Sequence, residues 1–249
     1  MDGFTASDEM SFGLGMDRRA AKEFLDATGI RLAGGHYYDA GDPAFEKMCD
    51  YYVALGGKQF GTGGEFFGDM DGLKRKMELM VKDSETAKKY GLRYYYHNHV
   101  WEFQKFGGEA VWDIMLRELP ADLVSFELDA FWAARSGMDP VEVIRKTGDR
   151  LIILHQKDFN GASEYRRNLW EYRLDPEAPI TDWECIHGLE DDFVEVGTGV
   201  LPIQNYIDAG NESGVEYIVL EQDYTKLPEL ESIRVSMDAF RKFRGVEWE

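Results

Sequence analysis

The chain has 249 residues, of which 44% are hydrophobic and 14% aromatic, and this is enough apolar material for one large core. Its 28 lysines and arginines are outnumbered by 47 aspartates and glutamates, and the formal net charge of -19 argues against nucleic acid as a partner. Cys49 and Cys185 lie far apart, no signal-like apolar stretch opens the chain, and no apolar run approaches the ~20 residues of a membrane helix, so we expect one cytoplasmic domain over 1–249 with no membrane partner.

Helical periodicity alternates with short β-rich runs along most of the chain, which is typical of a parallel sheet covered by helices. Glycine and proline indicate several boundaries: Gly29 and Gly91 each follow a helix, and Pro43 and Pro140 each open one. In chain order the pattern predicts a helix at 18–27, a strand at 31–38, a helix at 43–55, a strand at 58–61, a helix at 73–90, a strand at 92–96, a helix at 111–119, a strand at 123–128, a short helix from 140, a strand at 151–154, a helix at 202–214, a strand at 216–220 and a helix at 230–243.

The segment 159–200 is too long and too irregular for an ordinary connection between two elements. It is rich in acidic residues and contains Trp170, Trp183 and the run Gly197-Thr198-Gly199. Because it joins two strands that end in candidate site residues, we expect it to form a lid over a pocket.

Polar side chains follow four of the predicted strands at the point where each strand ends. In chain order these are His97, His99 and Glu102, then Asp129, then His155, then Glu221. The carboxyl ends of the strands in a parallel barrel all face one side, so residues far apart in the sequence converge there. Carboxylates together with an imidazole form a mixed oxygen and nitrogen site that suits one divalent metal ion, Mn²⁺, Mg²⁺, Co²⁺ or Zn²⁺.

The runs HNHVWEF, SFELDAFWA with GMDP behind it, LIILHQKDF, EVGTG and YIVLEQD resemble the sugar phosphate isomerase/epimerase family, which shares the xylose isomerase-like TIM barrel. The likeness extends from about residue 29 to residue 243. It implies a (β/α)8 barrel that binds one divalent metal through two glutamates, one aspartate and one histidine. Asp129, His155 and Glu221 stand on matching positions, so the resemblance implies that they are ligands.

The fourth ligand is expected to be Glu102, with His97 as a substitute. Family members often carry a glutamate at the end of the strand, where this chain has Tyr96 and His97, and Glu102 is the carboxylate that follows in the same motif. The resemblance also implies that further side chains contact the substrate: Lys157 and Glu195, with His99, Trp132 and His36 as additional candidates.

Members of the family that the chain resembles begin with a strand and a helix that have no counterpart at the start of this chain. We therefore expect a barrel that lacks the first strand-helix unit. An unpaired strand edge is costly, because it exposes a row of backbone hydrogen-bonding groups. The open edge near 31–38 is expected to be covered by a second copy of the chain, a partner subunit or the N-terminal residues.

The expected reaction is the isomerisation or epimerisation of a small sugar, keto-sugar or inositol-like substrate through an enediolate. Glu102 and Glu221 are the predicted acid and base, with His97 or His99 as an alternative base. The same groups would serve a lyase that eliminates a β-substituent from a 3-keto-glycoside or keto-inositol. An endonuclease IV-like DNA repair enzyme is disfavoured by the five histidines and the negative charge, and a non-catalytic subunit of a complex is the remaining alternative.

Overall fold

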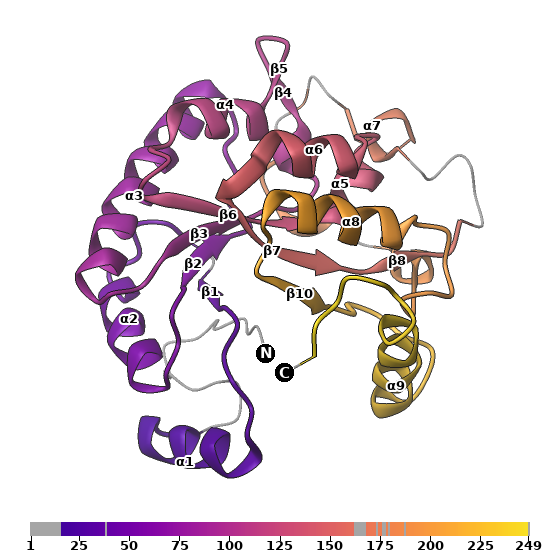
Figure 1. The fold of residues 1–249 in the computed structure, drawn as a ribbon. Helices are drawn as coiled ribbons and strands as arrows, with labels where there is room; N and C mark the ends of the chain where they lie inside the picture. The colour runs from indigo at the N-terminus through magenta and orange to yellow at the C-terminus, as the bar shows by residue number, and fades with distance from the viewer. Residues whose placement is uncertain are drawn as a thin grey trace. The chain divides into compact units, whose positions relative to one another are not determined.

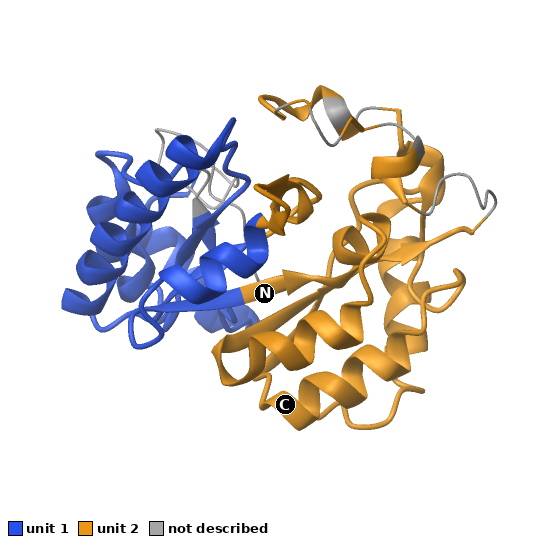
Figure 2. Cartoon of the chain, turned by 90° about the horizontal axis from the view of Figure 1, so that it is seen from above, with its two compact units in different colours: residues 1–97, 111–126 blue, residues 98–110, 127–249 orange. Residues whose placement is uncertain are grey.

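The computed structural model describes residues 16–37, 39–161, 168–172, 174–175, 178, 180–186 and 188–248 (Figure 1). The chain divides into two compact units (Figure 2). Unit 1 comprises residues 1–97 and 111–126, and unit 2 comprises residues 98–110 and 127–249. The described residues contribute six strands to the parallel sheet. The α/β class is therefore confirmed, while residues 1–15 and the expected cover of an open edge lie outside what is described.

Unit 1 places helices around short parallel strands. β1 pairs with β2, and β2 pairs with β3. The elements of unit 1 are α1 (Arg18–Thr28), β1 (His36–Tyr37), α2 (Phe45–Ala54), β2 (Gly61–Gly63), α3 (Met70–Lys89), β3 (Tyr94–His97), α4 (Val111–Glu118) and the beginning of β6 (Val124–Asp129).

The predicted helices of unit 1 are confirmed, and side chains at their ends explain where they begin and end. Asp17 accepts a hydrogen bond from the backbone of Ala20 at the start of α1, and Gly29 ends this helix at a φ of 68°. Asp69 starts α3 in the same way, by accepting from the backbone of Gly72. This helix therefore begins three residues before the predicted start at 73.

Two predicted strands of unit 1 are wrong in extent. Of the strand expected at 31–38, the described residues 31–37 form only β1. In the strand expected at 58–61, Gln59 makes an isolated parallel bridge to Arg93, and the continuous strand is β2, which begins at Gly61. Glycine has low strand propensity, so the run Gly61-Thr62-Gly63 carries little local signal. Packing requires it, because a Cβ at Gly61 would stand 1.8 Å from the backbone oxygen of Tyr95 on β3. The position of β2 is thus decided by its neighbours.

Asp83 on α3 provides a prediction about stability. Its carboxylate is buried and accepts a hydrogen bond from the backbone of Gly41 at 2.7 Å. Burial raises the pKa of the Asp83 carboxyl from 3.8 to about 6, although the bond from Gly41 opposes the shift. A raised pKa means that this group favours folding below its unfolded pKa and that this contribution is lost as the pH rises through the folded pKa.

Asp83→Asn is therefore expected to increase the free energy of unfolding at pH 8 by about 1–3 kcal/mol and to change it little at pH 4. The asparagine keeps an oxygen that accepts from Gly41. Urea denaturation at the two pH values measures the difference, and a gain that is larger at pH 4 than at pH 8 would contradict the expectation.

Unit 2 contains the longer strands and most of the irregular segments. β10 pairs with β7 in parallel, with His155 opposite Val219. The elements of unit 2 are η1 (Trp101–Phe103), β4 (Lys105–Phe106), β5 (Glu109–Ala110), the end of β6, α5 (Ala130–Arg135), α6 (Pro140–Thr147), η2 (Gly148–Arg150), β7 (Leu151–Gln156), β8 (Asp158–Phe159), α7 (Leu169–Tyr172), η4 (Trp183–Ile186), η5 (Glu190–Asp192), β9 (Phe193–Val194), α8 (Ile203–Ser213), β10 (Tyr217–Leu220) and α9 (Glu229–Phe240).

The segment 159–200 is more ordered at its ends than its sequence suggested. β8 and β9 pair antiparallel, with Asp158 opposite Val194. The Asp158 carboxylate also accepts hydrogen bonds from the backbones of Gly197, Gly199 and Leu201 at 2.9 to 3.1 Å. The two ends of the segment are thereby joined. Residues 162–167 and several others up to 187 lie outside the described residues, and closure of this segment as a lid stays a prediction.

No helix within the described ranges combines the length and the apolar character that crossing a membrane requires.

Candidate metal-binding site

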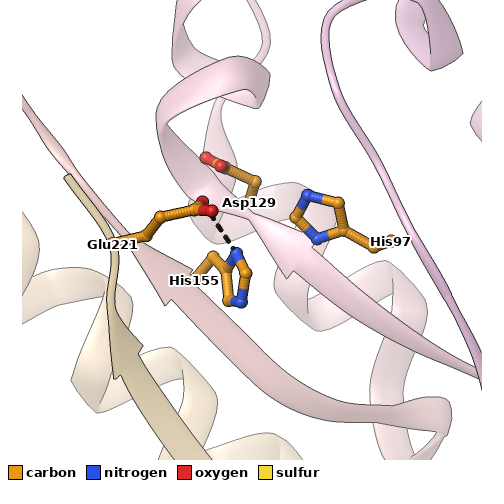
Figure 3. A group of neighbouring side chains, drawn as sticks. All are labelled: His97, Asp129, His155 and Glu221. Atoms are coloured by element: carbon orange, nitrogen blue, oxygen red, sulfur yellow. Dashed lines mark hydrogen bonds and ion pairs between the residues drawn. The ribbon is translucent and has the colours of Figure 1, made fainter. Parts of the chain in front are cut away.

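Three of the predicted ligands lie together in unit 2. One ligand atom from each of Asp129, His155 and Glu221 lies within 4.8 Å of the others, and Figure 3 draws them, together with His97 of unit 1. Nδ1 of His155 is 3.0 Å from Oε2 of Glu221. The backbone of Glu221 donates to the carbonyl of Gln156, which extends the pairing of β10 with β7 by one residue. This pairing brings Glu221 beside His155.

Asp129 is held from two sides. It ends β6 and caps α5, because its Oδ1 accepts hydrogen bonds from the backbones of Phe131 and Trp132 at 2.9 and 3.1 Å. Its own backbone nitrogen donates to Oδ1 of Asn98 at 2.9 Å. With one carboxylate oxygen engaged in the cap, Oδ2 is the oxygen that faces Lys157, at 2.9 Å. The carboxylate is completely buried, and the two hydrogen bonds to Oδ1 orient it.

Lys157 places its ammonium group among carboxylates. Nζ lies 2.9 Å from Asp129, 2.7 Å from Glu221 and 3.1 Å from Asp223. Burial by itself lowers the pKa of Lys157, but the nearby carboxylates Asp129, Asp223 and Glu221 outweigh it and hold this pKa well above its ordinary value. The ammonium also lies 5.5 Å from the centre of the Trp132 ring. Its predicted contact with substrate stays a prediction.

The charges and donor types of the cluster fit a divalent cation. Glu127 contacts Nε2 of His155, so carboxylates adjoin both nitrogens of the imidazole. Counting Asp129 and Asp223, four carboxylates face one imidazole and one ammonium. Glu127 and Asp129 are completely buried, and negative charge in such excess around them is costly unless a cation offsets it. Carboxylate oxygen with imidazole nitrogen is also the donor set of Mn²⁺, Co²⁺ and Zn²⁺ sites.

Glu102, the fourth predicted ligand, is engaged by its own turn. It lies in η1, is fully buried, and accepts a hydrogen bond at 2.8 Å from the backbone of His99. It does not belong to the group of ligand atoms around Asp129 and His155 within the described residues. His97, the suggested substitute, is the residue before Asn98 in the chain. Asn98 accepts a hydrogen bond from the backbone of Asp129 within unit 2.

The remaining predicted site residues occupy several places. The ring of His99 stacks on Trp101 with centroids 4.7 Å apart and meets Trp183 edge-on at 4.8 Å. His36 lies in unit 1, where its ring stacks on that of His97 at 4.7 Å. Glu195 accepts a hydrogen bond at 2.5 Å from the hydroxyl of Thr225. Their roles toward a substrate stay predictions.

An aromatic cavity of about 420 Å³ lies next to the cluster in unit 2, within the ~300–1,000 Å³ typical of small-molecule sites. Trp132 and Asp223 belong to its wall and also adjoin Lys157. Trp132 is only 1% exposed, and its indole nitrogen has no hydrogen-bond acceptor among the described residues. The residues that line the cavity are Trp132, Trp183, Ile186, Phe193, Asp223 and Tyr224.

Sequence reasoning missed three residues of the cluster: Glu127, Asn98 and Asp223. A signal existed for two of them. Side chains two positions apart in a strand share one face, so Glu127 points to the same side of β6 as Asp129. Asp223 stands two positions after Glu221 in the same strand-end run, just beyond β10. Asn98 accepts a hydrogen bond from the backbone nitrogen of Asp129, and no periodic pattern in the sequence predicts such a contact.

A model of the xylose isomerase-like TIM barrel family matches residues 2–243. Among solved structures, a sugar phosphate isomerase/epimerase from Parabacteroides distasonis ATCC 8503 is 18% identical, with a TM-score of 0.76 over 99% of this chain and 88% of that one. The IolI protein with a bound zinc atom is 15% identical, with a TM-score of 0.64 over 91% and 84% of the two chains. D-psicose 3-epimerase, solved in the presence of D-fructose, is 12% identical, with a TM-score of 0.64 over 93% and 86%. No protein with a curated functional description matches the chain.

Proposed function

Because the chain belongs to the xylose isomerase-like TIM barrel family, we propose that it is a divalent-metal-dependent isomerase or epimerase of a small sugar, keto-sugar or inositol-like substrate. The observation that carries the proposal is the gathering of Asp129, His155 and Glu221 at the ends of their strands, beside an aromatic cavity. The names of the structural neighbours, a D-psicose 3-epimerase and a sugar phosphate isomerase/epimerase among them, support the same class of reaction.

Asp129, His155 and Glu221 would hold the cation, and the fourth ligand stays the one expected from the sequence, Glu102 with His97 as a substitute. One carboxylate oxygen of Glu102, Oε2, already accepts a hydrogen bond from the backbone of His99. When bound, a divalent cation polarises a substrate carbonyl and acidifies the neighbouring C–H bond.

The chain's own groups would then move the proton and orient the substrate. Glu221 is 35% exposed, unlike the completely buried Asp129, so its carboxylate is the one accessible to a substrate proton. The partner acid or base would come from the HNH run, as His97 or His99. Lys157, whose ammonium group lies among Asp129, Glu221 and Asp223, would donate hydrogen bonds to a substrate oxygen.

The cavity supports a polyhydroxylated substrate. Trp132, Trp183, Phe193 and Tyr224 offer aromatic surface against which the C–H face of a sugar packs. The indole N–H of Trp132 is a buried donor without an acceptor in the described part of the chain, and a substrate hydroxyl would supply one. Asp223 would accept from a second hydroxyl.

Exchange of substrate hydrogen with solvent tests the proposed reaction. The chain is stripped with a chelator, reloaded with Mn²⁺, Mg²⁺, Co²⁺ or Zn²⁺, and incubated in D₂O with a panel of ketoses that includes D-psicose, D-fructose and D-tagatose, and with 3-keto-glycosides. We expect metal-dependent deuterium uptake at the carbon beside the carbonyl, together with an isomer or epimer detected by NMR. Loss of a β-substituent would identify the lyase instead. A product formed equally well without metal would contradict the proposal.

A further inference from the structure

The imidazole of His155 has a carboxylate at each of its two nitrogens. Glu221 lies 3.0 Å from Nδ1, and Glu127 contacts Nε2. His155 is 2% exposed, and Glu127 is completely buried. Solvent therefore does not satisfy the Nε2 side of the ring, and nothing proposed above gives Glu127 a part in binding or turnover.

Glu127 is brought to this place by the alternation of β6. Residues two positions apart on a strand share a face, so Glu127 and Asp129 point to one side while Leu128 points to the other. A buried carboxylate has a large desolvation cost, which a hydrogen bond from a ring N–H offsets. An apolar residue at position 127 would fit the buried strand without this desolvation cost. The presence of a glutamate therefore indicates that His155 needs a carboxylate beside its Nε2.

A neutral imidazole carries one proton on its two nitrogens, and a metal ion needs the nitrogen that lacks it. Glu221, the neighbour of Nδ1, belongs to the group of candidate ligands, whereas Glu127, the neighbour of Nε2, does not. Nδ1 is therefore the nitrogen on the metal side, and the proton must reside on Nε2.

We propose that Glu127 is a positioning residue, which accepts the Nε2–H of His155 and so holds this ring in the tautomer and orientation that present Nδ1 to the divalent cation. The proposal rests on the metal site proposed above. In known metal sites, loss of a carboxylate behind a ligating histidine weakens metal binding by about 10–100-fold.

Glu127→Gln is the most informative variant, because it keeps the size of the side chain. The amide oxygen is a weaker acceptor for the Nε2–H than a carboxylate, and the amide NH₂ can instead donate to Nε2, which favours the proton on Nδ1 and disables the metal-side nitrogen. Glu127→Asp keeps the acceptor on a shorter side chain and should restore part of the affinity. Glu142→Gln on the exposed surface of α6 removes the same charge in the same unit and serves as the matched control.

Isothermal titration of the full chain with Mn²⁺ and with Zn²⁺ measures the dissociation constants, and circular dichroism in a chelator checks folding. We expect at least about tenfold weaker binding for Glu127→Gln, an intermediate value for Glu127→Asp and no change for Glu142→Gln. Binding by a folded Glu127→Gln within twofold of the wild type would overturn the role of Glu127. A wild-type chain that binds neither ion would overturn the metal site itself, so the two failures are distinguishable.

Imidazole ¹⁵N NMR of the Zn²⁺-loaded chain gives a second readout that does not depend on any variant that folds poorly. The chain has only five histidines, which makes assignment of His155 practicable. We expect the Nε2–H form for His155 in the wild type. The Nδ1–H form in the wild type would overturn the proposal.

Discussion

Glu221→Gln and Asp129→Asn are each expected to abolish turnover and to weaken metal binding. Loss of a residue that only supports a metal ligand weakens binding by about 10–100-fold, and the loss of a ligand itself should exceed that. Each substitution removes an anionic oxygen donor while keeping the shape of the side chain. The fold should survive, because asparagine caps a helix as well as aspartate does, and Asp129 is the cap of α5.

Two matched controls separate loss of the ligand from loss of structure. Asp139 caps α6 by accepting from the backbone of Val141 at 2.9 Å, so Asp139→Asn makes the same change at an exposed cap. Glu142→Gln is the matching control for Glu221→Gln, because it makes the same change at an exposed position of α6. Titration with Mn²⁺ and circular dichroism are measured on all four variants. Near wild-type turnover with full metal occupancy in either site variant would show that the proposed site is wrong.

Lys157→Met is expected to have opposite effects on the stability of the metal-free chain and on its affinity for metal. The ammonium is 3% exposed and contacts Asp129, which is completely buried, as well as the partly exposed Glu221 and Asp223. Removing one partner of a buried ion pair typically costs about 3–5 kcal/mol, and the exposure of two of the three carboxylates places this case toward the lower value.

The same substitution removes a positive charge beside the proposed cation. Two unit charges about 4 Å apart interact by several kcal/mol near a protein surface, so metal affinity should rise by on the order of tenfold or more. Turnover should fall, because the proposed donor to the substrate is lost. Urea denaturation with a chelator and titration with Mn²⁺ measure the two effects, with the exposed Lys242→Met as control. Weaker metal binding in Lys157→Met would mean that Lys157 helps to build the metal site instead of competing with the cation.

Local patterns, together with the family resemblance, were sufficient to single out the three candidate ligands that the structure gathers. Asp129, His155 and Glu221 each follow an apolar run, and the carboxyl ends of parallel strands share one side of a sheet. Helix ends were predictable for a similar reason. Gly29 and Gly214 end α1 and α8 with φ values of 68° and 79°, and a glycine reaches that conformation at little cost. These features depend on neighbours in the sequence, and so the sequence alone determined them.

Features that depend on contacts between distant residues were decided by the tertiary structure. β2 lies at Gly61–Gly63 because it pairs there with β1 and β3, and the close approach of β3 leaves no room for a Cβ at Gly61. Whether a strand-end residue faces the site also depends on its local partner: Glu102 bonds to the backbone of its own turn. Glu127 acquires its partner because β6 and β7 bring residues 28 positions apart into contact. The energy of such a contact exists only once the chain has folded, because burial is what makes an unpaired carboxylate costly.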